Sequence, residues 1–373
     1  MAQEWIPAAF MRGGTSKGLF FEESALPCDT RVRDAFFLSA LGSPDRYGRQ
    51  LNGMGGGLSS LSKAVVVTPS ARDGVDVDYT FAQIAVDKPV VDYASNCGNL
   101  ASAVGPFAVD QGLVTPPEGM ATVRLFNTNT DKVIHAHFEV TEGYARVDGD
   151  FTIPGVSGTG APVKLDFLDP GGSRTGRLLP TGATIDHLTA DRGSIPVSMI
   201  DAANPVVFVA AEAVGLRGAE TVNELEARPA VLAILEELRR QAAVAMGLCD
   251  RREDAPLSNP KVAIIAPPTT YITLDGTVVD ANDFDISVRT ISSGQVHRAI
   301  PVTAALCTAV AQKLRGTLVA DMAAGTGSAL RIGSPSGVFA ADADVDSSSG
   351  GARSASLYRT CRRLMQGSVP HLQ

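Results

Sequence analysis

Short stretches that are rich in β-branched residues, or that alternate apolar with polar residues, recur through the first half of the chain. They predict strands at residues 64–68, 75–86, 122–126 and 133–140. Helices are expected at residues 29–41 and 99–111. The second of these helices carries almost no charge, so we expect it to be buried, and Gly105 with Pro106 should kink it.

The second half repeats this order of elements. Strands are expected at residues 197–209, 262–266, 285–291 and 317–319. Helices are expected at residues 221–246 and 302–314, and the latter is again rich in small apolar residues. In both halves strands lead to a glycine-containing loop and then to an Ala-rich helix. The pattern favours an α+β fold of two pseudo-duplicated lobes, each with a mostly antiparallel sheet around a central helix.

The length of 373 residues also favours two domains. A connection rich in glycine and proline, at residues 154–176, precedes the expected boundary. We place the N-terminal lobe at residues 1–185 and the C-terminal lobe at 186–354. The segment 355–373 is expected to cross back to the first lobe. A cleft between two lobes is a usual place for a ligand.

Composition and charge exclude several classes of protein. The chain is 45% hydrophobic and 19% charged, and its net charge of −8 argues against a nucleic-acid partner. No run of apolar residues is long enough to span a membrane, and residues 1–5 do not resemble a signal peptide. The five cysteines are widely spaced, which favours free thiols and a cytoplasmic location.

Cys97 has the most informative surroundings. It lies between Asn96 and Gly98-Asn99, at the expected N-terminus of the buried helix. Free backbone N–H groups and the helix dipole favour negative charge there, so they could lower the pKa of a thiol or hold a carboxylate. The alternative is a packing residue, since free cysteines usually behave as small buried hydrophobes.

Two further loops carry glycines beside polar donors. Residues 11–18 (MRGGTSKG) offer Arg12, Ser16 and Lys17, whereas residues 53–63 (GMGGGLSSLSK) lead through three glycines to Lys63. Such loops can present backbone N–H groups to an anion. A solvated turn and an edge lysine are the alternatives. If Lys63 lies in a closed cleft, desolvation would lower its pKa towards that of a working base.

The histidines do not indicate a hydrolase or a metal centre. No acid–histidine pair accompanies the loops, which disfavours a catalytic triad. His135 and His137 would share one face of a strand, but further metal ligands are not evident, so we interpret them as structural. His297 lies in the glycine loop of the second half and is a candidate substrate contact.

A thiol and an amine among many anion donors suggest proton transfer at a carbon next to a carboxylate. One group would remove a proton and the other would deliver one, while the donors stabilise the enolate-like charge. This chemistry needs no cofactor and no metal.

Motifs along nearly the whole chain resemble those of one family. They are MRGGTSKG (11–18), GSPD (42–45), GMGGGLSSLSK (53–63), VDYASNCGN (91–99), NPVVFV (204–209), PKVAIIAPP (260–268), SSGQVH (292–297) and GSPSG (333–337). In them the chain closely resembles the PrpF family of 2-methylaconitate cis-trans isomerases and 4-oxalomesaconate tautomerases. That family has a diaminopimelate-epimerase-like fold.

The resemblance implies an active site between two lobes and a cofactor-independent allylic isomerisation of an unsaturated tricarboxylate. It assigns catalysis to Lys63 and Cys97. The residues that it places around the substrate are Arg12, Ser16, Lys17, Gly56, Ser60, Asn96, Gly98, Asn99, Ser293, Gly294 and His297. The epimerases of this fold carry a second cysteine before the second-lobe helix, whereas residues 299–303 contain none, which disfavours a two-cysteine racemase.

The expected reaction is therefore the trans-to-cis isomerisation of 2-methylaconitate in the methylcitrate route of propionate catabolism. The alternatives are 4-oxalomesaconate tautomerisation in aromatic-acid degradation and a non-catalytic tricarboxylate-binding protein. The expected partner is the small-molecule substrate, with no nucleic acid and no membrane. The sequence leaves open whether the chain forms a homodimer and which of Lys63 and Cys97 is the base.

Overall fold

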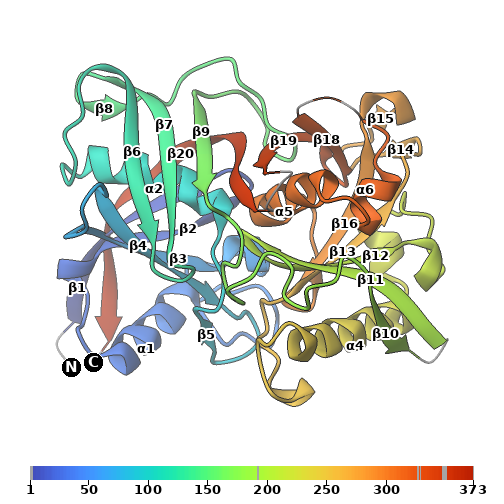
Figure 1. Ribbon diagram of the computed structural model, residues 1–373. Coiled ribbons are helices and arrows are strands. Elements are labelled where there is room, and N and C mark those ends of the chain that lie inside the picture. Colours follow the sequence, from blue (N-terminus) through green and yellow to red (C-terminus); the bar gives the residue numbers. More distant parts are fainter. Residues whose placement is uncertain (1–2, 191–192, 326, 328, 347–350, 373) are drawn as a thin grey trace. The chain divides into compact units, whose positions relative to one another are not determined.

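The computed structural model describes residues 3–190, 193–325, 327, 329–346 and 351–372. The chain divides into two compact units (Figure 1). The first comprises residues 1–165 and 359–373, and the second comprises residues 166–358. The segment 166–185 thus belongs to the second unit, whereas the sequence placed it in the N-terminal lobe, 1–185. The cause is Asp201, whose carboxylate accepts hydrogen bonds from Ser173, Arg174 and Thr175 of this segment.

The first unit is a mixed sheet with two α-helices. Its strands are β1 (Gln3–Gly13), β2 (Ser16–Glu22), β3 (Lys63–Pro69), β4 (Val77–Ile84), β5 (Val91–Asp92), β6 (Gly119–Asn127), β7 (Lys132–Thr141) and β8 (Tyr144–Ala145). Strands β9 (Pro162–Leu168) and β20 (Ala352–Leu372) contain residues of both units. Strand β2 pairs in parallel with β3, β3 antiparallel with β4, and β4 in parallel with β6. The C-terminal part of β20 pairs with β1 along its length.

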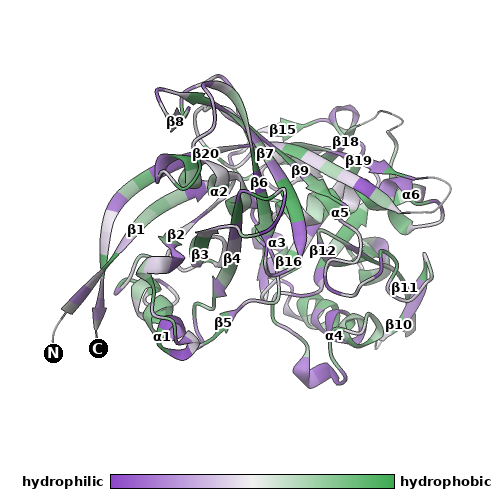
Figure 2. Ribbon diagram, turned by 60° about the vertical axis from the view of Figure 1, so that its left-hand side comes forward, coloured by the Kyte–Doolittle hydropathy of each residue, from purple (hydrophilic) through white to green (hydrophobic). Residues whose placement is uncertain are grey.

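The helices of the first unit begin and end where local chemistry favours it. Helix α1 (Thr30–Leu41) is capped by Asp29, whose carboxylate accepts from two backbone N–H groups, and it ends at Gly42 with a φ of 75°. Helix α2 (Gly98–Asp110) is buried from Gly98 to Val109, as its lack of charge predicted. It continues through Pro106 and packs against β1, β2 and β6 (Figure 1). Strand β3 is hydrophobic over most of its length (Figure 2).

The second unit repeats these pairings around helix α5 (Val302–Lys313). Its strands are β10 (Asp186–Ala190), β11 (Gly193–Ala202), β12 (Asn204–Ala210), β13 (Lys261–Ala266), β14 (Tyr271–Ile272), β15 (Val278–Val279), β16 (Ile286–Ser292), β17 (Gln295–Val296), β18 (Ala329–Ser334) and β19 (Gly337–Val345). Strand β12 pairs in parallel with β13, β13 antiparallel with β16, and β16 in parallel with β18. This is the order seen around β2, β3, β4 and β6, so the predicted duplication is present.

Three predicted elements of the second unit are wrong in detail. The helix expected at residues 221–246 is two helices, α3 (Val222–Glu226) and α4 (Pro229–Ala245), because Pro229 begins a new helix. The strand expected at 197–209 is β11 and β12, with Ala203 at a φ of 62° between them. Residues 317–319 are not a strand: the Thr317 hydroxyl accepts from the Ala320 N–H and caps helix α6 (Leu318–Met322).

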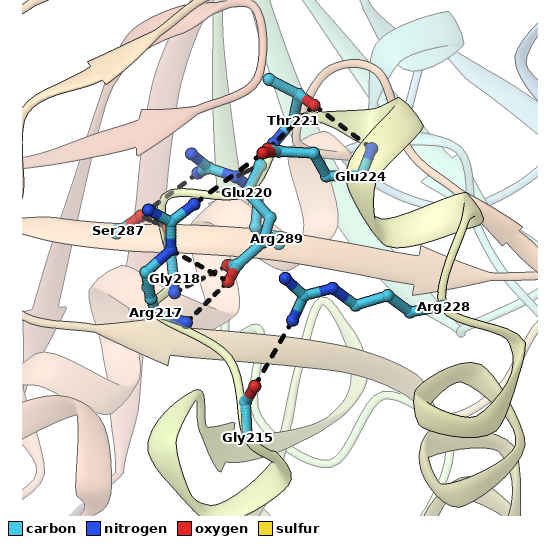
Figure 3. Close-up of polar contacts among 9 residues, drawn as sticks. All are labelled: Gly215, Arg217, Gly218, Glu220, Thr221, Glu224, Arg228, Ser287 and Arg289. Carbon is cyan, nitrogen blue, oxygen red and sulfur yellow. Dashed lines mark hydrogen bonds and ion pairs between the residues drawn. The ribbon is translucent and has the colours of Figure 1, made fainter.

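A buried polar network stabilises the second unit (Figure 3). Glu220 accepts from the backbone N–H groups of Arg217 and Gly218. The Arg289 guanidinium donates to the Glu220 carbonyl at 2.8 Å and to the Ser287 hydroxyl at 3.2 Å. These bonds compensate for the burial of the arginine, whose pKa is lowered to about 10 by desolvation. They join the segment before α3 to strand β16.

Candidate active site

Lys63 is the first residue of β3 and is almost fully buried. Its Nζ donates to Gln83 Oε1 at 2.5 Å and lies 4.9 Å from the centre of the Phe81 ring. Burial lowers the pKa of the Lys63 ammonium, and the nearby Cys97 thiol opposes that shift. The alternative of a solvated edge lysine is therefore excluded. Lys63 and Cys97 also lie within electrostatic reach of each other.

Cys97 is the N-cap residue of α2 and is half-buried. Its carbonyl accepts the first helical hydrogen bond, from Ala101, so the preceding N–H groups of the helix have no partner within it. Cys97 Sγ lies 3.9 Å from Ser16 Oγ. The structure thus brings together Lys63, Cys97 and Ser16 from three separate motifs of the sequence.

Asn99 fastens the Cys97 loop to the turn between β1 and β2. Its Nδ2 donates to Thr15 Oγ1 at 3.1 Å, and its Oδ1 accepts from the Thr15 N–H at 3.3 Å. The same Oδ1 accepts from Arg359 Nε at 3.3 Å. Glycine at position 13 is required because a Cβ there would lie 2.5 Å from the Asn99 carbonyl oxygen. Asn99 therefore has a positioning role, and substrate contact by its side chain stays a prediction.

Asn96, on the other side of Cys97, is also held in place. Its Oδ1 accepts a hydrogen bond from the Tyr79 hydroxyl at 3.0 Å. Tyr79 is buried, and desolvation raises the pKa of its phenol well above the ordinary value. The phenol consequently stays protonated and acts as a fixed donor that orients Asn96. Gly98 is buried as the first residue of α2.

The glycine-rich loop before Lys63 is organised by Gln50, which the sequence did not single out. Gln50 Nε2 donates to the Ser62 hydroxyl at 2.7 Å, and Gln50 Oε1 accepts from the Gly57 N–H at 3.0 Å. Within this loop Gly56 is exposed, and Ser60 is half-buried in a 3₁₀ turn at Ser59–Leu61. The hydrogen bonds of Gln50 therefore fix the backbone conformation around these two residues, and the glycines of the loop can adopt it.

The two cations of the first glycine loop have local partners. Arg12 Nη1 donates to the carbonyl groups of Gly14 and Thr360 at 3.0 and 2.9 Å, and burial lowers its pKa. Lys17 Nζ lies 5.4 Å from the centre of the Phe10 ring. Arg12 thus ties the turn to the C-terminal strand, and a contact of either cation with substrate stays a prediction.

The remaining predicted residues belong to the second unit. Ser293 and Gly294, with φ of 52° and 72°, form the two-residue turn between β16 and β17. Gly294 is exposed, and the backbone N–H of His297 donates to the Thr290 carbonyl at 2.8 Å. Among the described residues, no group of three or more His, Cys, Asp or Glu side chains could hold a metal ion.

Comparison with known proteins identifies the family. A sequence model of the PrpF protein family matches residues 3–371. The chain belongs to the PrpF family. It is 40% identical to a 2-methyl-aconitate isomerase of Cupriavidus necator, covering 98% of this chain and 96% of the relative. It is 39% identical to a (4E)-oxalomesaconate Delta-isomerase of Novosphingobium, covering 97% of this chain and 96% of the relative.

A solved crystal structure supports the fold. The crystal structure of a methylitaconate-delta-isomerase aligns with a TM-score of 0.81 and 38% identity, covering 99% of this chain and 96% of that chain. The predicted α+β fold and the prediction of an isomerase are both confirmed. No helix among the described residues is long and apolar enough to cross a membrane.

Proposed function

We propose that this PrpF protein moves a C=C bond in an unsaturated tricarboxylate, and that its substrate is trans-2-methylaconitate in the methylcitrate route of propionate catabolism. The observation that carries the proposal is the pairing of Lys63 with Cys97. Each of the two groups can carry a proton, and they lie within electrostatic reach of each other. The reaction is proposed for the cytoplasm, since all five cysteines are free thiols.

Lys63 is proposed as the first base. An ordinary lysine is almost fully protonated near neutral pH and cannot accept a proton. Burial of Lys63 lowers its pKa, which increases the fraction of neutral amine. The buried Phe81 ring and the neutral Gln83 amide hold the Nζ without adding a negative charge.

Cys97 is proposed as the group that returns a proton. Its thiol is half-buried at the N-terminus of α2, and its Sγ lies 3.9 Å from Ser16 Oγ. The N–H groups of the first helical turn, which have no partner within the helix, are suited to a substrate carboxylate or to the enolate-like charge. These roles of Lys63 and Cys97 could be exchanged without altering the overall reaction.

The reaction proceeds in two balanced steps. Lys63 removes a proton from the carbon next to the double bond, and the electron pair delocalises through the C=C bond towards a carboxylate. Return of a proton from Cys97 to the far carbon moves the double bond. Return to the carbon that lost the proton, after rotation about the delocalised bond, gives the cis isomer of 2-methylaconitate. The catalyst is left as an ammonium and a thiolate, and a proton transfer between them or through solvent restores it.

The residues of the first unit that are proposed to bind the substrate are Arg12, Ser16, Lys17, Gly56, Ser60, Asn96, Gly98 and Asn99. Ser293, Gly294 and His297 stay predicted substrate contacts. Three carboxylates need several donors, and the backbone N–H groups, hydroxyls and cations of these loops can supply them. No metal or redox cofactor takes part in the proposed steps.

The test follows proton exchange directly. The purified protein is incubated in D2O with trans-aconitate, a related tricarboxylate, and then with 2-methylaconitate, and both are followed by proton NMR. We expect loss of the methylene signal of trans-aconitate and conversion of 2-methylaconitate to its cis isomer. Lys63→Ala and Cys97→Ala should each lower the rate by several orders of magnitude while the circular dichroism spectrum stays unchanged.

The same assay separates the alternatives. The two relatives described above differ by one percentage point in identity to this chain, so identity alone does not select the substrate. Turnover of 4-oxalomesaconate without turnover of 2-methylaconitate would assign the protein to the tautomerases. Line broadening of every tricarboxylate without exchange would indicate binding alone. Near-full activity in both alanine variants would refute the catalytic pair.

A further inference from the structure

Gln83 is the closest polar neighbour of the proposed base, and it was not among the predicted site residues. Strands β3 and β4 place Gln83 directly opposite Lys63. Gln83 is 6% exposed, and its Oε1 accepts the hydrogen bond from Lys63 Nζ at 2.5 Å. The contact comes from cross-strand register between residues that are 20 positions apart, so the local sequence does not show it.

The orientation of the Gln83 amide is fixed by its other contacts. Gln83 Nε2 donates to the Ser62 carbonyl at 2.9 Å and to the Ser59 carbonyl at 3.0 Å. Carbonyl oxygens only accept hydrogen bonds, so the NH2 end must face them. The oxygen end of the amide must then face Lys63, and a rotation by 180° would lose all three bonds.

The charge on this neighbour matters for proton transfer. The titratable group that faces Lys63 is Cys97, and the other contacts of the ammonium are the Phe81 ring and the neutral amide. A carboxylate at the distance of Gln83 Oε1 would strongly favour the protonated amine. An apolar side chain there would remove the only acceptor that Gln83 supplies and would favour the neutral amine.

We propose that Gln83 is a positioning residue for Lys63, whose neutral amide holds the Nζ in place without pairing it with a negative charge. This rests on the proposed function of Lys63 in proton transfer. Gln83 also joins the base to the glycine-rich loop through the Ser59 and Ser62 carbonyls. The shape of that loop and the direction of the Lys63 amine are thereby set together.

The test is the pH dependence of kcat/KM for two opposite substitutions. Gln83→Glu places a carboxylate beside the amine, so the limb of the profile that belongs to Lys63 should move to higher pH by about one unit or more. Gln83→Leu removes the acceptor, so the same limb should move to lower pH. The direction of each shift is the same whether Lys63 takes up or gives off the proton.

Gln50→Leu is the matched control. Gln50 is also a buried glutamine that fastens the glycine-rich loop, through Ser62 and Gly57, but its contacts do not include the Lys63 amine. Its substitution should leave the position of the Lys63 limb unchanged, whatever happens to the rate. A merely structural role for Gln83 would produce the same result in Gln83→Leu as in Gln50→Leu.

Three outcomes decide the matter. Opposite shifts in the two Gln83 variants support the proposal. Profiles that coincide with the wild type in folded Gln83 variants overturn it, provided that Lys63→Ala is inactive. An active Lys63→Ala protein refutes the proposed function of Lys63 instead. If Gln83→Glu does not fold, Gln83→Asn replaces it in the test, because its neutral amide is one methylene further from Lys63. The limb of the pH profile that belongs to Lys63 should then move to lower pH. An unshifted limb in Gln83→Asn overturns the proposal.

Discussion

The side chain of Asn99 joins three separate segments of the first unit, and Asn99→Ala should therefore weaken the whole site. The substitution removes the hydrogen bonds to Thr15 N–H, Thr15 Oγ1 and Arg359 Nε. Arg359 is fully buried, and desolvation already lowers its pKa to about 9. Loss of an acceptor from so buried a cation is expected to be the largest single effect.

The magnitude follows from the burial of each bond. Bonds of partly exposed neutral groups contribute about 1 kcal/mol, and bonds to a charged group contribute about 1.5–3 kcal/mol. The two Thr15 contacts are partly buried and, like the Arg359 contact, are 3.1–3.3 Å long, so values at the lower end apply. We expect the free energy of unfolding to fall by about 2–4 kcal/mol in total.

Urea denaturation, followed by circular dichroism, measures this change. Asn52→Ala is the control, since Asn52 is exposed and its loss should change stability by less than about 0.5 kcal/mol. Asn99→Asp separates the roles of the amide, because a carboxylate still accepts from Thr15 and Arg359 but cannot donate to Thr15 Oγ1. It should lose less stability than Asn99→Ala. Equal stability of Asn99→Ala and wild type would refute the reasoning.

Three further predictions concern the same unit and the thiols. Gly13→Ala would place a Cβ 2.5 Å from the Asn99 carbonyl oxygen, so thermal unfolding should show a loss of about 1–3 kcal/mol, and an unchanged midpoint would contradict the close approach. Burial raises the pKa of Cys361 to about 12 and that of Cys307 further, so a thiol reagent at pH 8 should modify exposed Cys28 first and these two only after unfolding. Folding lowers the pKa of Lys63, so between the folded and unfolded pKa values the unfolded chain binds more protons than the folded one. The free energy of unfolding of wild type relative to Lys63→Met should therefore rise with pH up to about 10.5. Denaturation at a series of pH values measures this difference, and a difference that does not change with pH would contradict the lowered pKa.

The sequence predicted the elements that carry a strong apolar signal. Helix α2, strand β3 and their equivalents α5 and β13 were located because their residues are almost uniformly apolar. The errors fell where a single residue overrides the pattern. The spacing of apolar residues predicts one continuous helix at 221–246, but Pro229 divides it into two. At Thr317 the β-branched residues favour a strand, but the Thr317 hydroxyl caps a helix.

The contacts that support the site could not be found in this way. Asn99 and Arg359 are 260 positions apart in sequence, and they meet only because the C-terminal strand pairs with β1. Gln83 acts through cross-strand register, and Gln50 through a folded loop. No local pattern distinguishes such glutamines from surface residues. The motifs therefore predicted which groups perform chemistry, whereas the folded structure shows which contacts hold those groups in place.

The kind of polar group that stabilises each region differs in a way that suits proton transfer. Around Lys63 and Cys97 the polar neighbours include the amides of Gln83, Asn96 and Asn99, which carry no charge at any working pH. In the second unit the buried carboxylates of Asp201 and Glu220 accept hydrogen bonds from backbone N–H groups and hold the neighbouring segments in place. A carboxylate beside the lysine would hold the amine in its charged form and would itself compete for the proton. Fixing the proposed base by neutral amides avoids both effects, so the first unit can hold Lys63 in place and still permit the proposed proton transfer.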